Sequence, residues 1–355
     1  MRTILTLTLL AAIAAPAAAQ TERSVERDRQ RARDAAREAA TEARRERDQR
    51  QERSDSREQV DRVTRTLKIG ANGELVLANI AGDILVGRGG NEVSVEIVKT
   101  ARGRSDEDAR ELLQLVQVEV IERSGRAEVR ARYPEGEEMR RNNRRNINVS
   151  VAYNVTAPAG IRLRAHSISG SITVKEIKGE VTAESVSGTV RIFNAGRISS
   201  AKSISGTVEI NDAEIDGTFN ASSVSGSVVL RRVKARMLEL GSISGNVLLD
   251  DVDSQQVEAQ SVSGNVSFGG PVGRSGRYEL SSHSGNVTVA LGGASGFEVE
   301  ATSFSGSIRS DFNFGTDPSD SGRGRRRQTI RGVHGDGSAV LELTTFSGNI
   351  VISKK

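Results

Sequence analysis

The dipeptide Ser-Gly recurs nine times between Ser169 and Gly348, always in the same local context. Its glycines follow one another at intervals of 18, 18, 20, 19, 19, 21, 21 and 42 residues, and the last interval is twice 21. A period near 20 residues is typical of solenoids, in which each repeat buries its apolar face against its neighbours. The glycines are Gly170, Gly188, Gly206, Gly226, Gly245, Gly264, Gly285, Gly306 and Gly348.

Alignment of the repeats on these glycines shows apolar residues at alternate positions on both sides. The positions two and four residues after the glycine are almost all aliphatic, as in Ile172 and Val174, and the positions between them are mostly polar. This period of two predicts two strands per repeat, joined by a corner at Ser-Gly. We therefore expect an all-β fold, a single-stranded β-solenoid or β-helix of about ten coils stacked about 4.8 Å apart.

The corner residues have a structural explanation. Glycine is expected there because it adopts a positive φ without strain. Serine before the glycine, and serine or threonine three residues before it, are expected to stack as ladders of hydroxyl groups that satisfy the backbone of the turn. The repeated serines are therefore predicted to be structural rather than catalytic.

The interval between Gly306 and Gly348 lacks its middle Ser-Gly. We expect a loop at residues 315–335 that leaves one coil, followed by strands at 340–344 and 349–352 that complete the last coil. Lys354 and Lys355 follow directly, and charge beside a terminal strand is one way in which proteins protect a sheet edge.

The residues before the repeats divide into three segments. Residues 1–19 contain a short apolar stretch and end in three alanines, which predicts a secretory signal peptide rather than an uncleaved anchor. Residues 20–60 form an arm rich in Arg, Glu and Ala, for which helix and disorder both remain open. Residues 61–160 are expected to form a β region with one short helix at 105–116, opened by a capping box at Ser105. Residues 161–355 form the predicted solenoid.

Composition narrows the chemistry. The chain has no cysteine, which excludes disulfides, thiolate metal sites and a cysteine nucleophile. Aromatic residues make up only 3%, so the core is expected to consist of Val, Ile, Leu and Ala. With a signal peptide and no other segment apolar enough to cross a membrane, we expect an exported protein of the periplasm or the cell surface.

The repeated unit Ser-Val-Ser-Gly-x-Val-x-Ile resembles that of the bacterial putative-adhesin family of β-strand-repeat proteins, a domain of unknown function. The entry at 157–161, the segment 331–337 and the closing Thr345-Phe346-Ser347-Gly348-Asn349-Ile350 are also similar to that family. The resemblance covers about residues 67–352. It implies a β-solenoid of the cell envelope or surface, and it brings no catalytic residues.

The densest positive cluster is the candidate binding site. Arg323, Arg325, Arg326, Arg327 and Arg331 lie in or beside the predicted loop, where guanidinium groups could contact phosphate or carboxylate polymers. The alternative is a solvated loop without a partner.

No catalytic, cofactor or metal site is expected. His166, His283 and His334 fall in different columns of the repeat, and the acidic segment 250–253 lacks the ligand spacing of a calcium loop. The arm holds 12 arginines against 11 acidic residues between Thr21 and Val60, so no nucleic-acid partner is expected.

These features predict an exported, non-enzymatic interaction scaffold of the cell envelope or surface, adhesin-like, with an unidentified polymer or protein as partner. The alternatives are a structural protein that self-associates through its coil edges, a regulatory partner in envelope stress, and a polysaccharide-active β-helix enzyme.

Overall fold

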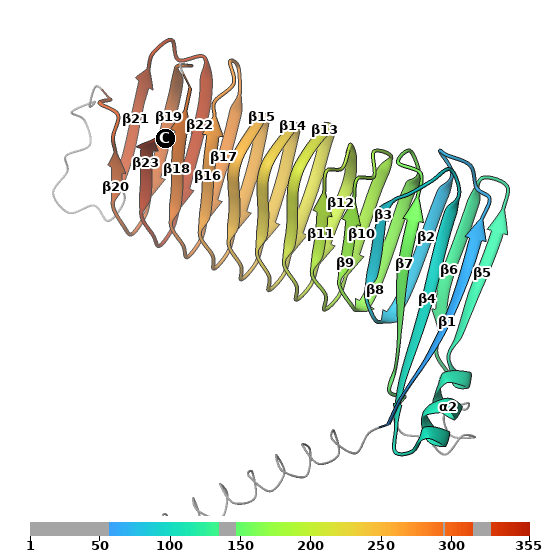
Figure 1. The fold of residues 1–355 in the computed structure, drawn as a ribbon. Helices are drawn as coiled ribbons and strands as arrows, with labels where there is room; N and C mark the ends of the chain where they lie inside the picture. The colour runs from blue at the N-terminus through green and yellow to red at the C-terminus, as the bar shows by residue number, and fades with distance from the viewer. Residues whose placement is uncertain (1–56, 135–146, 294, 315–327) are drawn as a thin grey trace, which may run out of the picture. The chain divides into compact units, whose positions relative to one another are not determined.

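The computed structural model describes residues 57–134, 147–293, 295–314 and 328–355. Within these residues the fold is all-β with one helix, and the 23 strands are hydrogen-bonded into one sheet (Figure 1). Glu58–Lys355 form one compact unit. The elements are β1 (Arg57–Leu67), β2 (Glu74–Ala81), β3 (Ile84–Arg88), β4 (Val93–Gly103), α2 (Asp106–Leu115), β5 (Gln117–Arg123), β6 (Arg126–Arg132), β7 (Val149–Ala157), β8 (Arg162–Ser169), β9 (Ile172–Lys175), β10 (Glu180–Ser185), β11 (Val190–Phe193), β12 (Arg197–Ser203), β13 (Val208–Ser223), β14 (Val228–Ser242), β15 (Val247–Ser261), β16 (Val266–Pro271), β17 (Arg277–Ser282), β18 (Val287–Gly292), β19 (Phe297–Ser303), β20 (Ile308–Ser310), β21 (Gln328–His334), β22 (Ala339–Thr345) and β23 (Ile350–Lys354).

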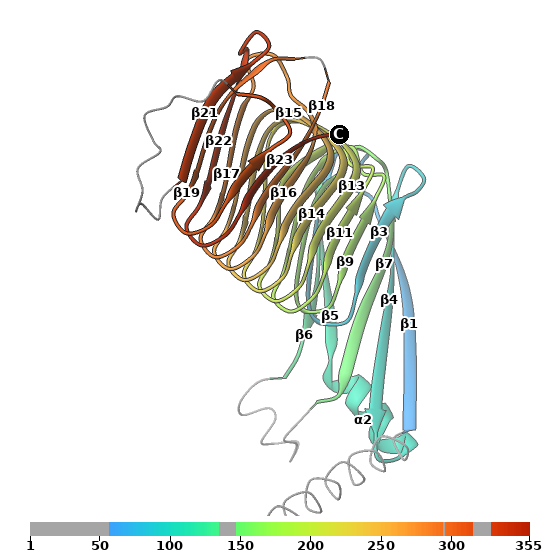
Figure 2. The same cartoon turned by 90° about the vertical axis from the view of Figure 1, so that its left-hand side faces the viewer.

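Successive repeats pair in parallel and in register, as the aligned columns predict. Ala165, Ala183, Ala201 and Ala221 are neighbours in one ladder of strands that precede Ser-Gly. Strands that follow Ser-Gly form a second ladder, in which Ile172, Val190 and Val208 are neighbours. We call the residues of one repeat a rung and name it after its glycine. Figure 2 shows the rungs stacked behind one another.

The core lies between the two ladders. The inward columns of both ladders are buried in most rungs, although Ile308 of the Gly306 rung is only half-buried. Residues such as Leu163, Val181, Val190 and Ile210 have no exposed surface. Because identical or similar side chains repeat at each rung, the core is a set of aliphatic columns with few rings, as the composition predicts.

The hydroxyl ladder is present, and it belongs to the residue three positions before each glycine. Ser203 Oγ accepts a hydrogen bond from the amide of Gly206 at 2.8 Å and donates one to the carbonyl oxygen of Gly188 in the preceding rung at 2.9 Å. Ser185, Ser223, Ser242 and Ser261 make the same pair of bonds. Each buried hydroxyl therefore links two rungs.

The predicted reason for glycine at this corner is wrong. None of the nine glycines has a φ in the left-handed region. A Cβ on Gly188 would instead lie 1.9 Å from the carbonyl oxygen of Gly170, and a Cβ on Gly206 would lie 2.1 Å from that of Gly188. Glycine is required because the backbones of adjacent rungs approach too closely for any side chain.

The left-handed corner lies six residues further on and contains no glycine in five successive rungs. Glu176, Asn194, Asp212, Arg232 and Asp251 have φ between 51° and 58°. L-residues adopt this conformation at a cost of about 1–2 kcal/mol each. The alignment missed this corner because its residue types differ from rung to rung.

The order of the last rungs differs from the order of the chain. β22 and β23 pair in parallel with β17 and β18 on one side and with β19 and β20 on the other. The Gly348 rung therefore lies between the Gly285 and Gly306 rungs, and β21 continues the sheet beyond β19 in antiparallel orientation. The prediction that 340–352 completes the last coil is wrong, and Lys354 and Lys355 do not flank a terminal strand.

The ladders continue beyond the boundary expected at residue 160. β2 pairs in parallel with β8, and β3 with β9, so that Gly82 lies beside Gly170. β4 and β7 are antiparallel, as are β5 and β6. The helix α2 lies where the capping box predicts one, and Ser105 Oγ accepts from the amide of Asp108 at 3.1 Å.

β1 begins inside the segment assigned to the charged arm. Its sequence contains few apolar residues, but ion pairs connect it to β4: Glu58 with Arg102 and Asp61 with Lys99, both at 2.9 Å. Charged residues therefore form a strand here because β4 offers opposite charges across the pair. In the described part of the chain, no helix is both long and apolar enough to cross a membrane.

Candidate functional site: an outer groove along the rungs

The predicted arginine cluster is only partly described. Arg323, Arg325, Arg326 and Arg327 lie outside the described residues. Arg331 lies on β21, where its guanidinium group donates to Glu300 Oε1 at 2.7 Å. The contact of these arginines with an anionic partner stays a prediction.

The three histidines have different neighbours. His166 lies 3.5 Å from Glu184, His283 stacks on Phe346, and His334 packs against the Phe312 ring at 4.8 Å. Among the described residues, no group of three His, Asp or Glu side chains is placed to hold a metal ion. Asp250 and Asp251 each lie 3.9 Å from Lys355 Nζ, which partly balances that acidic corner.

An exposed apolar row runs along the rungs and is the feature that sequence reasoning missed. It occupies the position two residues before each glycine, and its aliphatic members are 39–51% exposed. We call this the apolar row. It comprises Ile168, Val186, Ile204, Val224, Ile243, Val262, His283, Phe346 and Phe304.

The alternation of the strand explains why this row faces outward. Positions seven, five and three before glycine are buried, so positions six, four and two are on the opposite face. The signal was therefore present in the sequence, where aliphatic residues recur at an outward position. It could not be distinguished from the core pattern because the same aliphatic residue types also fill the core.

The apolar row ends in a stack of rings. The rings of His283 and Phe346 are 4.9 Å apart and nearly parallel, at 7°, and Phe346 lies 5.5 Å from Phe304. Offset ring stacks of this kind add to the energy of burial. Here they hold exposed rings, with Phe346 at 51% exposure.

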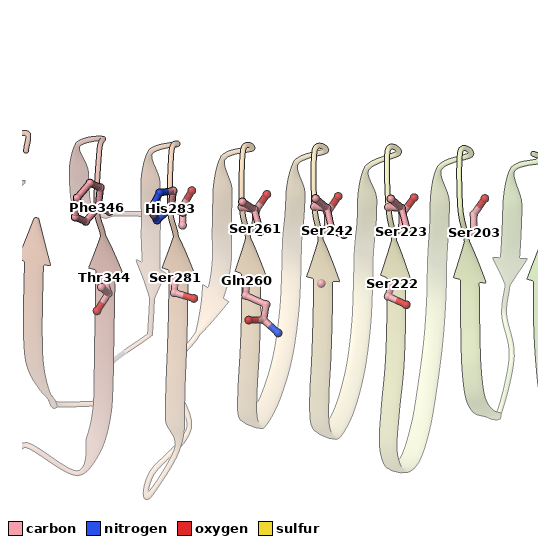
Figure 3. A pocket seen from close by; sticks show the side chains of 15 residues that line it. Ser203, Ser222, Ser223, Ser242, Gln260, Ser261, Ser281, His283, Thr344 and Phe346 are labelled. Carbon is pink, nitrogen blue, oxygen red and sulfur yellow. The ribbon is translucent and has the colours of Figure 1, made fainter. Parts of the chain in front are cut away.

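A groove of about 620 Å³ runs beside the apolar row, from Ser203 to Phe346. Figure 3 shows Phe346 and His283 at the ends of neighbouring strands and Thr344, Ser281, Gln260 and Ser222 in a parallel row one step along the strands. This second row, four residues before each glycine, is the groove floor. It comprises Ser222, Gly241, Gln260, Ser281 and Thr344.

Carboxylates form a third row on the same face. Glu239 pairs in register with Glu258, Glu258 with Glu279, and Glu279 with Glu342. We call these four residues the acidic row. Like charges on directly opposed strand positions destabilise a sheet, so the row is not explained by stability.

The chain belongs to the Toastrack DUF4097 family, whose model matches residues 116–353. This confirms the resemblance to a family of unknown function. None of the curated proteins matches the chain.

Several solved structures match most of this chain at low sequence identity. A putative adhesin from Parabacteroides distasonis has 9% identity and a TM-score of 0.44 over 83% of this chain and 97% of its own. A putative adhesin from Bacteroides fragilis has 13% identity and a TM-score of 0.41 over 83% and 97%. A putative lipid binding protein from Parabacteroides distasonis has 14% identity and a TM-score of 0.41 over 82% and 96%.

Proposed function

We propose that this chain is an exported, non-enzymatic β-solenoid that binds a partner of the cell envelope or cell surface through its outer sheet face. The coils of this solenoid are the rungs, closed on one side by the Ser-Gly corner and on the other by the left-handed corner. The observation that carries the proposal is the groove beside the apolar row, which crosses six rungs from Ser203 to Phe346.

Exposed apolar side chains in a continuous row favour an interaction surface, because scattered exposure is ordinary whereas contiguous exposure marks binding sites. The buried serines of the ladder support a structural role for this residue type. The hydroxyl of Ser242, for example, both accepts from the amide of Gly245 and donates to the carbonyl of Gly226. Such hydroxyls are already committed to backbone partners.

Retention on isolated cell envelopes tests this function. The wild-type chain is expected to sediment with the envelope fraction, and Ile243→Ser with Val262→Ser is expected to release it. Val60→Ser is the control, because Val60 is exposed on β1, away from the groove. Equal recovery of all three proteins in the supernatant contradicts the proposal.

Self-assembly is the second candidate, and one observation favours it. β21 adds to the flank of β19 and is largely exposed, with Val333 at 57% exposure. Strands at the flank of a sheet can pair with another chain. A sedimentation coefficient that does not change with protein concentration excludes this alternative.

A further inference from the structure

The three outer rows together form a trough with unlike walls. The groove itself is lined by the apolar row and by a floor made chiefly of small residues such as Ser222, Gly241 and Ser281. The acidic row is the next outward position beyond that floor and borders it on the side opposite to the apolar row. The walls are four residues apart along each strand, which at about 3.3 Å per residue separates them by roughly 13 Å.

The acidic row has unmet charge at its centre. Arg277 lies 2.8 Å from Glu342, and Asn220 donates to Glu239 at 3.3 Å. Glu258 and Glu279 are exposed, and among the described residues no ion pair reaches either of them. Carboxylates stacked about 4.8 Å apart repel one another, so a cationic partner would relieve a repulsion that is already present.

We propose that the trough binds a basic amphipathic α-helix whose axis runs along the stack of rungs. A helix with its side chains is about 10–12 Å wide, and its pitch of about 5.4 Å gives close to one turn per rung. Leucine-like residues on one face would contact the apolar row, and Lys or Arg on the adjacent face would contact the acidic row. Such binding is helix-in-groove recognition with added charge complementarity.

The geometry disfavours the other linear partners. An extended peptide places every second side chain about 6.7 Å apart, which does not match the rung spacing of about 4.8 Å. An anionic polymer would be repelled by Glu258 and Glu279. The rungs from Gly226 to Gly348 span four intervals, roughly 19 Å, which corresponds to a helix of about 13 residues, so that a peptide of about 16 residues covers them.

The first rungs of the same sheet provide an internal control. Ile168 and Val186 continue the apolar row there, but Arg164 and Thr182 occupy the position that the acidic row occupies further along. The proposal therefore places the helix on the Gly226–Gly348 part of the row and not on the Gly170–Gly188 part.

The test uses the full chain and a labelled 16-residue peptide with leucines on one helical face and lysines on the adjacent face. Fluorescence anisotropy is expected to show saturable binding that weakens with salt. E258Q/E279Q and I243S/V262S are each expected to weaken binding by at least about tenfold, which corresponds to about 1.4 kcal/mol. V186S is expected to leave it unchanged.

Three results overturn the proposal. The first is that E258Q/E279Q binds the peptide as tightly as the wild-type chain. The second is that a scrambled peptide of the same composition binds equally well. The third is that a peptide with glutamate in place of lysine, or a neutral polysaccharide, binds more tightly than the basic peptide. Far-UV circular dichroism of each variant excludes unfolding as the cause. This inference rests on the proposed function, but the experiments distinguish the two. Retention on cell envelopes without binding of the peptide would contradict the binding of a helix and leave the proposed surface interaction standing.

Discussion

Gly206 lies so close above Gly188 that a Cβ on Gly206 would lie 2.1 Å from the Gly188 carbonyl oxygen. This distance is set by the hydrogen bonds between rungs, because Ser205 donates its amide to the carbonyl of Val186 at 2.8 Å next to it. The corner therefore cannot accept a methyl group without separating two rungs.

We expect Gly206→Ala to lower the free energy of unfolding by about 3 kcal/mol, the upper part of the range for overpacked interiors. Gly241→Ala is the matched control, because a Cβ there would have its nearest neighbour at 3.9 Å, on the Gln260 side chain. Urea denaturation measures both. Equal stability of the two variants would show that the corner can move apart.

Ser203→Ala is expected to lower the free energy of unfolding by about 1–3 kcal/mol, because it leaves the Gly206 amide and the Gly188 carbonyl without their buried hydrogen-bond partner. Ser205→Ala removes the same atom from an exposed position two residues later and is expected to change stability by less than about 0.5 kcal/mol. The comparison of their urea midpoints separates the ladder serine from the exposed one.

Glu176→Gly is expected to stabilise the protein by about 0.5–1 kcal/mol, because φ at Glu176 is 58° and glycine adopts this conformation without strain. Lys175→Gly, at the neighbouring exposed strand position, is expected to destabilise by a similar amount. Thermal unfolding of the two variants provides the measurement. A destabilising Glu176→Gly would mean that the left-handed corner carries no strain.

Removal of residues 339–355 is expected to detach β19–β21 while the earlier rungs stay folded. β22 is the parallel partner of both β17 and β19, so its loss leaves the Gly306 rung without a neighbour in the parallel ladder. Hydrogen exchange is expected to show fast amides at Phe297–Ser303 and unchanged protection in β13 and β14. Full protection of Phe297–Ser303 in the truncated chain contradicts the insertion.

All three tyrosines are expected to ionise only at strongly alkaline pH. Burial raises the pKa of Tyr133 to about 12 and also raises the pKa values of Tyr153 and Tyr278. Their hydroxyls donate to backbone carbonyls, as Tyr278 does to Ser254 at 2.7 Å. A raised folded pKa gives stability that is complete below pH 10 and is lost as pH rises toward 12.

Absorbance at 295 nm at pH 10.5 is therefore expected to show much less tyrosinate in the native protein than after denaturation in urea, where about three quarters of the tyrosines are ionised. Tyr133→Phe is expected to reduce the loss of stability between pH 10 and 12. Normal titration of a native tyrosine near pH 10 would contradict the buried hydroxyls.

The alignment of the repeats predicts the stacked strands because buried residues recur at the same position in each repeat of about 20 residues. Ala165, Ala183 and Ala201 are neighbours in space for that reason. The conformation of Gly188 was not predictable in this way, because glycine serves a close approach and a positive φ equally well. The insertion of the Gly348 rung could not be predicted from the sequence either. The Gly285 and Gly306 rungs have the same residue pattern, so the sequence does not show which of them the Gly348 rung pairs with.

The groove was predictable in part. Side chains alternate along a strand, so the positions next to the buried Ser242 and Leu240 face outward. These positions are Ile243 and Glu239. That Glu258 and Glu279 are neighbours could not be predicted without knowing the register between strands of different repeats. The charged β1 could not be separated from the arm, because only its pairing with β4 makes residues such as Glu58 part of a sheet.

The insertion of β22 and β23 between earlier strands has a consequence for how the chain reaches its final state. Synthesis delivers residues from the N-terminus onward, so the rungs through Gly285 can add one by one as they emerge. The Gly306 rung cannot take its place in that sequence, because the strands on which it rests emerge after it. The final stages of folding must therefore wait for the last residues, and an interrupted chain exposes the unpaired flank of β17 and β18.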